Sequence, residues 1–199
     1  MSSQGTPATF ACAIQVSSAE LRISYRVAND ADRRLGLFNR ISAIRLDGTA
    51  DYSPNNVYVD LEGHRLLVRK IVLPIPPDLK VGARDVPGIT LVDRKSVFSE
   101  EIRLPLPILA CNPYRRALIM LKAGGGIVVA DQPVRAEEVE FSIGAFAVQE
   151  SWRFDPVSPA HPDIFRVWPP GPPVDAQRVV SQTERPPAGI EARDYRVLP

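Results

Sequence analysis

Apolar and polar residues alternate from Leu21 to Val27, within the stretch Ala19–Leu46 that anchors the interpretation of the whole chain. A period of two places the apolar side chains on one face of a strand and the polar ones on the other. The run stops at Asn29–Asp32, residue types that hydrogen-bond to their own backbone in turns. An extended pattern resumes over Leu35–Leu46. The pattern predicts two neighbouring strands of an antiparallel sheet with one buried face.

Similar short runs follow along the chain, separated by residues that favour turns. A β-hairpin is predicted over Val57–Leu73, with its turn at Glu62-Gly63-His64. Arg116–Lys122 is compatible with a strand or one helical turn, and the surrounding strands favour a strand. The other predicted strands are Phe10–Val16, Ile89–Val92, Val97–Leu104, Ile127–Ala130 and Val139–Ala147. Eight or nine short strands without a helix of normal length predict an all-β antiparallel sandwich of immunoglobulin-like type, with a barrel as the alternative.

Proline divides the chain into two predicted parts. The chain has 199 residues, of which 45% are hydrophobic and 24% are charged, and this is typical of a globular protein. It contains 20 prolines, about twice the usual share of roughly 5%. Half of them follow Ser151. We therefore predict a β-sandwich domain over residues 1–150 and a proline-rich C-terminal tail over residues 151–199, extended and looser from Val174 onward.

The predicted tail also carries large apolar side chains, which are scarce in disordered segments. We expect these to lie on the sandwich as a strap or to bind a partner as an arm, and the sequence leaves both alternatives open. Proline-rich segments are already extended and lose little entropy on binding. The predicted partner-binding residues are Trp152, Phe154, Phe165, Trp168, Pro169, Pro170, Pro172 and Pro173.

Charge argues against two classes of partner. The net charge is +1, and the basic residues occur in pairs rather than in a run. Nucleic-acid phosphates and anionic membranes attract basic stripes, so neither partner is expected. The first residues lack the apolar stretch of a secretory signal, and no segment reaches the ~18 apolar residues that indicate a membrane-spanning helix. We therefore expect a cytoplasmic protein.

Catalytic and metal-binding residues are too scattered to form a recognisable site. Cys12 and Cys111 are expected to be buried free thiols, with a single disulfide between the two sheets as the alternative. Neither His64 nor His161 has a local partner for nucleophilic catalysis. Two carboxylates at most occur in any one turn, as at Asp30 and Asp32, which is too few for a calcium site. We predict no catalytic residues, no metal and no cofactor.

These observations favour a non-catalytic protein-interaction or scaffold module that uses sandwich edges, loops and the tail. A homo-oligomer formed through the tail is one form of this prediction. The alternative is a small-ligand-binding sandwich or an inhibitor whose loops form a wedge. The candidate wedge loops surround Asp30, Cys111–Tyr114 and Gly124–Gly126. Phe146 points away from Phe141 on the last strand, and if exposed it would join an apolar patch suited to association.

Overall fold

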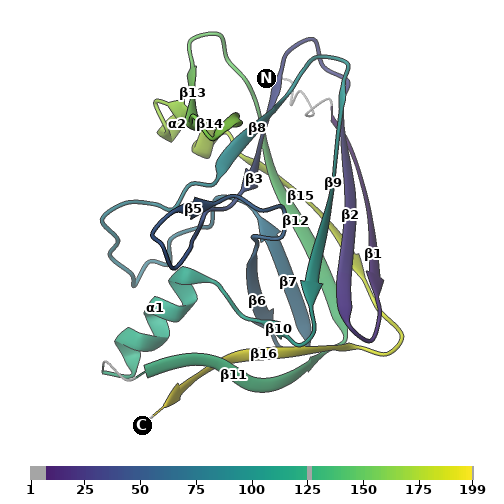
Figure 1. Ribbon diagram of the computed structural model, residues 1–199, viewed down its shortest axis with the longest axis vertical. Helices are drawn as coiled ribbons and strands as arrows, with labels where there is room; N and C mark the ends of the chain where they lie inside the picture. Colours follow the sequence, from purple (N-terminus) through teal and green to yellow (C-terminus); the bar gives the residue numbers. More distant parts are fainter. Residues whose placement is uncertain (1–7, 125–126, 199) are drawn as a thin grey trace.

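The computed structural model describes residues 8–124 and 127–198, which form sixteen strands and two helices (Figure 1). The strands are β1 (Ala8–Val16), β2 (Glu20–Asn29), β3 (Leu35–Arg40), β4 (Ala43–Ile44), β5 (Ala50–Asp51), β6 (Tyr58–Glu62), β7 (Arg65–Lys70), β8 (Gly88–Val92), β9 (Val97–Pro105), β10 (Ile108–Leu109), β11 (Ile127–Ala136), β12 (Glu138–Ala147), β13 (Arg153–Ser158), β14 (His161–Trp168), β15 (Arg178–Glu184) and β16 (Ile190–Leu198). The helices are α1 (Pro113–Lys122) and α2 (Gly171–Asp175). The all-β prediction is confirmed, whereas the immunoglobulin-like connectivity is not.

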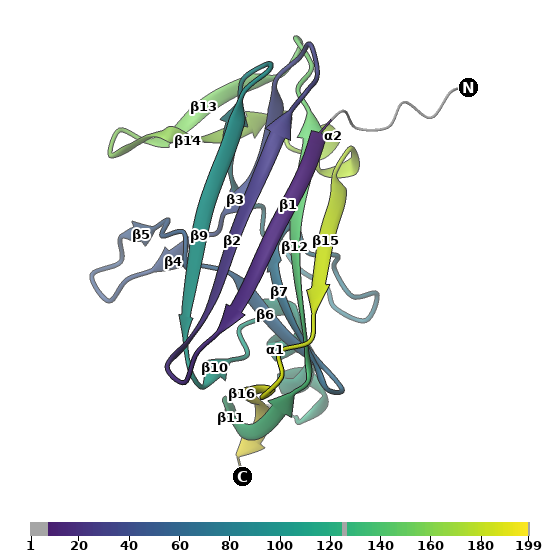
Figure 2. The ribbon, with the colours of Figure 1, turned by 90° about the vertical axis from the view of Figure 1, so that its right-hand side faces the viewer.

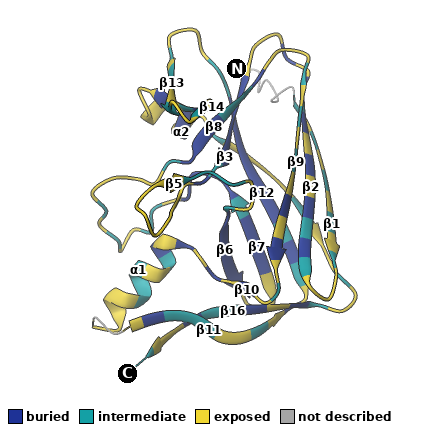
Figure 3. Cartoon of the chain, in the orientation of Figure 1, coloured by how far each residue is buried: buried dark blue, intermediate teal, exposed yellow. Residues whose placement is uncertain are grey.

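Two sheets face each other across the main hydrophobic core. The first has the strand order β1-β2-β9, and the second has the order β13-β14-β8-β3-β12-β7-β6, with β15 paired to β12. Leu21 and Ile23 of β2 are fully buried in the core that Phe141 and Ile143 of β12 also enter. Figure 3 shows the buried positions along the strands that face one another. The alternation predicted from Leu21 to Val27 therefore marks the core face of β2.

The prediction that β2 and β3 are neighbours in one sheet is wrong. β2 pairs with β1 and β9, whereas β3 pairs with β8 and β12 in the other layer. The turn after β2 crosses between the layers, and the buried amide of Asn29 fixes it. Asn29 Nδ2 donates to the carbonyls of Arg33, Val92 and Asp93 at 2.9–3.1 Å. An alternating pattern identifies the buried face of a strand but not its neighbour.

The second sheet is also covered on its outer face. Phe146 on β12 is 1% exposed, and its ring centroid lies 4.9 Å from that of Phe38 and 5.7 Å from that of Trp152. Phe146 therefore belongs to a second core cluster and forms no exposed patch. Trp152 comes from the predicted tail, so the tail completes this cluster on its own chain.

Regular strands replace the looser segment predicted from Val174 onward, and that prediction is wrong for β15 and β16. β15 pairs with β12 over seven positions, and β16 pairs with β11 and β10 in a third, smaller sheet. Segments rich in β-branched residues, such as Val179–Thr183, can form strands when they can pair with the edge of a sheet. The boundary predicted at residue 150 falls between β12 and β13 and stays a prediction.

A helix, α1, stands where a strand was favoured over Arg116–Lys122, and that prediction is wrong. Asn112 caps the helix, because its Oδ1 accepts hydrogen bonds from the N–H groups of Tyr114 and Arg115 at 3.0 and 3.2 Å. Pro113 occupies the first turn, where a missing N–H costs nothing. The Asn-Pro pair is thus a helix-start signal as well as a turn signal.

The three candidate wedge loops do not gather at one end of the described molecule. Figure 1 places the turn after β2 at the top and the start of α1 in the lower half. Gly125 and Gly126 lie outside the described residues. No helix in the described ranges is long and apolar enough to cross a membrane.

Candidate functional site

A hollow of about 550 Å³ lies between the loop before β8 and strand β14, and we call it the Trp168 groove. Its walls combine an exposed aromatic ring, apolar side chains and two arginines. The lining residues are Ser42, Tyr52, Ala83, Arg84, Asp85, Val86, Pro87, Gly88, Ile89, Val157, Arg166, Val167, Trp168 and Pro170. A mainly apolar hollow with a few charged groups is the usual form of a binding site.

Strand pairing builds the back wall of the Trp168 groove. Phe165 of β14 pairs with Ile89 of β8, which is 1% exposed. Gly88 permits the close approach of these strands, because a Cβ atom there would lie 2.6 Å from Cγ2 of Ile164. The adjacent Val167 is 4% exposed, so it forms an apolar floor. Both strands belong to the large sheet.

The charged side chains of the groove differ in whether they already have hydrogen-bond or ion-pair partners within the chain. The Asp85 carboxylate accepts a hydrogen bond from the Tyr58 hydroxyl at 2.6 Å. The backbone N–H of Asp85 donates to the Tyr114 hydroxyl at 2.8 Å. Arg84 and Arg166 are exposed, and neither forms an ion pair with any residue that the structure describes. Two arginines beside an aromatic side chain suit a carboxylate-bearing ligand.

The structure separates the eight predicted partner-binding residues into three groups. Trp152, Phe154 and Phe165 pack against the outer core cluster, so these rings contribute to the hydrophobic core of their own chain. Pro172 and Pro173 lie in the short helix α2, where Pro173 is buried. Trp168, Pro169 and Pro170 are exposed, with Trp168 at 53%. Trp168 and Pro170 line the groove, and their exposure leaves them accessible to a partner.

Sequence reasoning missed Tyr52, Arg84 and Arg166 as members of the same site. Tyr52 follows β5, and its ring packs edge-on against His161 at 5.1 Å between centroids. Arg84 lies in a loop that carries no recognisable motif, and Arg166 alternates on β14 with buried Val167. Residues on separate elements, here two exposed arginines and a half-buried tyrosine, give no sequence signal that they will meet.

A buried ionic cluster between the two main sheets is the second candidate. The Glu100 carboxylate of β9 lies 2.6 Å from Lys70 Nζ and 2.5 Å from an Arg40 nitrogen, and it accepts the Tyr25 hydroxyl at 2.7 Å. Lys70 Nζ also donates to the Asn39 carbonyl at 3.0 Å. Burial lowers the pKa of Lys70 to about 8, although Glu100 opposes the shift.

This ionic cluster joins layers rather than presenting groups to a ligand. The Lys70 side chain is fully buried and that of Glu100 is 5% exposed. The cluster links β9 of the first sheet to β7 and β3 of the second. Removing one partner from such a pair leaves an uncompensated buried charge. Its position therefore favours a structural role.

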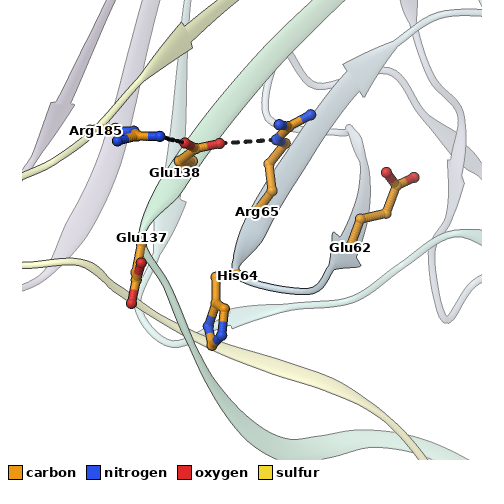
Figure 4. A pocket seen from close by; sticks show the side chains of 6 residues that line it. All are labelled: Glu62, His64, Arg65, Glu137, Glu138 and Arg185. Atoms are coloured by element: carbon orange, nitrogen blue, oxygen red, sulfur yellow. Dashed lines mark hydrogen bonds and ion pairs between the residues drawn. The ribbon is translucent and has the colours of Figure 1, made fainter.

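A third candidate is a hollow of about 490 Å³ at the β6–β7 turn, lined by acidic and basic side chains (Figure 4). Glu138 accepts hydrogen bonds from Arg65 Nε at 3.1 Å and Arg185 Nε at 2.7 Å. These two arginines lower the pKa of Glu138. His64 also lines the hollow, and its peptide carbonyl accepts the N–H of Glu137 at 2.7 Å. Because the carboxylate of Glu138 is already paired, this hollow offers less to a ligand than the Trp168 groove.

The two cysteines are free, as expected, but neither is a buried residue, and that part of the prediction is wrong. Cys12 is half-buried and Cys111 is exposed, although the Cys111 thiol lies against the backbone of Val57 and Val59. Burial, and to a lesser extent Glu184, raise the pKa of Cys12 to about 12, and burial raises that of Cys111 to about 11. The Cys111 thiol donates to the Val57 carbonyl at 3.0 Å and accepts the Val59 N–H at 3.2 Å. Nucleophilic thiols need a lowered pKa, so neither cysteine resembles a nucleophile.

Comparison with known proteins adds no assignment to this geometry. No protein-family model, no curated protein and no solved structure matches the chain.

Proposed function

We propose that the protein is a non-catalytic interaction module that binds an acidic, extended segment of a partner protein in the Trp168 groove. One observation carries this proposal. Arg84 and Arg166 line the same hollow as Trp168, and neither is engaged in an ion pair within the described chain. Aromatic residues and arginine dominate binding energy at protein interfaces.

The positive charge of Arg84 and Arg166 favours a partner segment that carries carboxylate side chains. Arginine pairs with carboxylates through two parallel hydrogen bonds and also stacks on aromatic rings. A segment with glutamate or aspartate beside an apolar side chain would pair with the arginines and cover Trp168 and Val86. The exposed residues Trp168–Pro170 give the partner a surface that loses little conformational entropy on binding.

A second candidate is the binding of a small carboxylate-bearing molecule in the same groove. The volume of about 550 Å³ supports it, because small-molecule pockets span roughly 300–1,000 Å³. The two candidates share their chemistry and differ in size. An extended peptide would also contact Pro170, whereas a small molecule would need only the arginines and one ring.

Fluorescence polarisation can test this proposal with a short labelled peptide that has glutamates on both sides of one phenylalanine. We expect saturable binding by the full chain that weakens as salt is added. Arg84→Gln, Arg166→Gln and Trp168→Ala should each weaken binding at least about tenfold. Arg94→Gln is the matched control, because Arg94 is exposed in the turn between β8 and β9, away from the groove.

Two results would count against the proposal. One is equal binding by Arg84→Gln, Arg166→Gln and the wild type. The other is equal loss of binding in Arg94→Gln, which would indicate a general effect of charge. Binding of benzoate but not of the peptide, with the same dependence on Arg84 and Arg166, would favour the small-ligand candidate.

We also propose a cytoplasmic location and association of copies through the tail as secondary parts of this function. The free thiols of Cys12 and Cys111 support the first, because reducing compartments preserve thiols. The exposed Trp168–Pro170 segment supports the second. Light scattering tests association directly, and a mass equal to one chain would contradict it.

A further inference from the structure

A short hairpin formed by β4 and β5 projects from the same side of the molecule as β13 and β14 (Figure 2). We call residues 43–51 the β4–β5 hairpin. At its tip, the Arg45 carbonyl accepts the Gly48 N–H at 2.9 Å, and the Arg45 N–H donates to the Thr49 carbonyl at 2.9 Å. Gly48 has a φ of 81°, the left-handed conformation that closes a hairpin turn of this kind. The tip therefore has a defined shape outside the body of the protein.

Two apolar side chains of the β4–β5 hairpin are uncovered. Leu46 is fully exposed, and Ile44 is 71% exposed. Single exposed leucines are common on protein surfaces. Here the leucine lies at the apex of a hydrogen-bonded turn that projects from the protein, where a partner can cover it on several sides.

Asp47 places a negative charge beside Leu46. Asp47 Oδ1 accepts the hydroxyl and the N–H of Thr49 at 2.6 and 2.9 Å, and these bonds lower the pKa of Asp47. Asp47 Oδ2 makes no hydrogen bond with any residue that the structure describes. The adjacent positive charge of Arg45 is paired with Asp51 at 2.7 Å. The tip thus presents an apolar side chain together with an available carboxylate oxygen.

The β4–β5 hairpin rises from the rim of the Trp168 groove. Ser42 and Tyr52, which flank the hairpin at its two ends, both line that groove. Asn56 fixes the base of the hairpin, because its Nδ2 donates to the carbonyls of Ile41 and Asp51 at 3.2 and 3.0 Å. Among the described residues that line the groove, none belongs to the hairpin itself. The tip is therefore held outside the groove of its own chain.

We propose that the Trp168 groove receives the β4–β5 hairpin of a second copy of the chain, so that two copies exchange hairpins. This inference rests on the function proposed above and names its partner. Leu46 of one copy would cover Trp168 of the other, and Asp47 would pair with one of the two groove arginines. The hairpin tip has the composition that the groove favours, a carboxylate beside an apolar side chain.

Symmetry favours a second copy over an unrelated protein. A two-fold dimer places the same surface patch of each chain on the other, so that patch must be complementary to itself. The projecting tip and the groove at its base are two such complementary parts on one surface. Exchange forms two identical contacts, which brings the buried area closer to the roughly 1,200–2,000 Å² of specific interfaces.

Sedimentation equilibrium of the full chain tests the exchange. We expect a mass of two chains as the concentration rises. Leu46→Ser and Asp47→Asn should each raise the dissociation constant of the dimer at least about tenfold. Leu121→Ser is the matched control, because Leu121 is 64% exposed on α1, away from the groove (Figure 1). A mass of one chain at every concentration, or an equal effect of Leu121→Ser, would overturn the proposal.

Photochemical cross-linking identifies what the tip contacts. A benzophenone amino acid in place of Leu46 should cross-link to residues 83–89 or 166–170. In a mixture of unlabelled chain and chain labelled with heavy nitrogen, mass spectrometry should find these cross-links between the two forms. Cross-links confined to single chains, or to other parts of the surface, would contradict the exchange.

Binding of the glutamate–phenylalanine peptide separates this inference from the proposed function. Leu46→Ser leaves the groove empty, so this variant should bind the peptide more tightly than the wild type, whereas Arg84→Gln should bind it more weakly. Equal, arginine-dependent binding by Leu46→Ser and the wild type would overturn the exchange and leave the proposed function standing. Absence of peptide binding by Leu46→Ser would overturn the proposed function and this inference with it.

Discussion

The ring of Phe146 lies directly over Gly36, its cross-strand partner on β3. A Cβ atom at Gly36 would lie 2.1 Å from Cζ of Phe146 and 2.6 Å from Cε1. Phe146 is held from the other side by Phe38 and Trp152. The glycine therefore creates the space in which an aromatic residue of β12 joins the outer core cluster.

Gly36→Val should reduce the free energy of unfolding by about 1–3 kcal/mol, because the ring of Phe146 cannot move away without displacing its neighbours. Urea denaturation measures this change. Gly82→Val is the control, since a Cβ atom at Gly82 meets nothing within 4 Å. It should shift stability by no more than about 0.5 kcal/mol. Equal losses in both variants would show that the ring does not fill this space.

Lys70 should make stability depend on pH in the alkaline range. Burial lowers the pKa of Lys70 from 10.5 to about 8. Between these values the folded protein binds fewer protons than the unfolded chain, so its stability rises with pH. The cost of burying the charged lysine is fully present below pH 8. It should fall by about 1 kcal/mol between pH 7 and pH 9.

Urea midpoints measured for the wild type and Lys70→Met at pH 7 and pH 9 check this prediction. Cys12 has a raised pKa and acts in the opposite direction, so the informative quantity is the difference between the two proteins. That difference should change with pH in Lys70→Met and stay constant in Lys80→Met, whose lysine is exposed. A constant difference in both variants would contradict the lowered pKa.

Removing the cap of α1 should destabilise the protein. Asn112 Oδ1 caps the helix, and its Nδ2 donates to Asp60 at 2.9 Å. Asn112→Ala should cost about 1–2 kcal/mol of unfolding free energy, measured in urea. Asn112→Ser retains an oxygen acceptor for the cap and should recover part of that loss. Full loss in the serine variant would assign the effect to the bond with Asp60 instead.

The thiols should react slowly while the protein is folded. Burial raises the pKa of Cys111 from 9.0 to about 11, which leaves about a hundredfold less thiolate at pH 8. Alkylation by iodoacetamide, followed by mass spectrometry, should therefore be slow in buffer and fast in denaturant. Cys111→Ser and Cys12→Ser assign the reacting residue. Rapid modification of either folded thiol would contradict the raised pKa values.

Local pattern was sufficient for individual strands and turns. The alternation before Asn29 predicted the core face of β2, and the hairpin over Val57–Leu73 forms as β6 and β7. These features depend on nearest neighbours in the sequence and on a period of two, which the chain itself displays. The sequence also contains the signal for the start of α1, Asn112-Pro113. The same pair of residues is common in turns, so the sequence did not distinguish a helix cap from a turn.

Tertiary structure alone decided which strands pair and which surfaces remain open. The sequence does not reveal that β2 and β3 lie in different layers, that Trp152 covers Phe146, or that Arg84 and Arg166 share one groove. Each of these facts joins residues far apart along the chain. A strand pattern gives every side chain a face, but pairing partners and free edges depend on how all the strands compete for the same core.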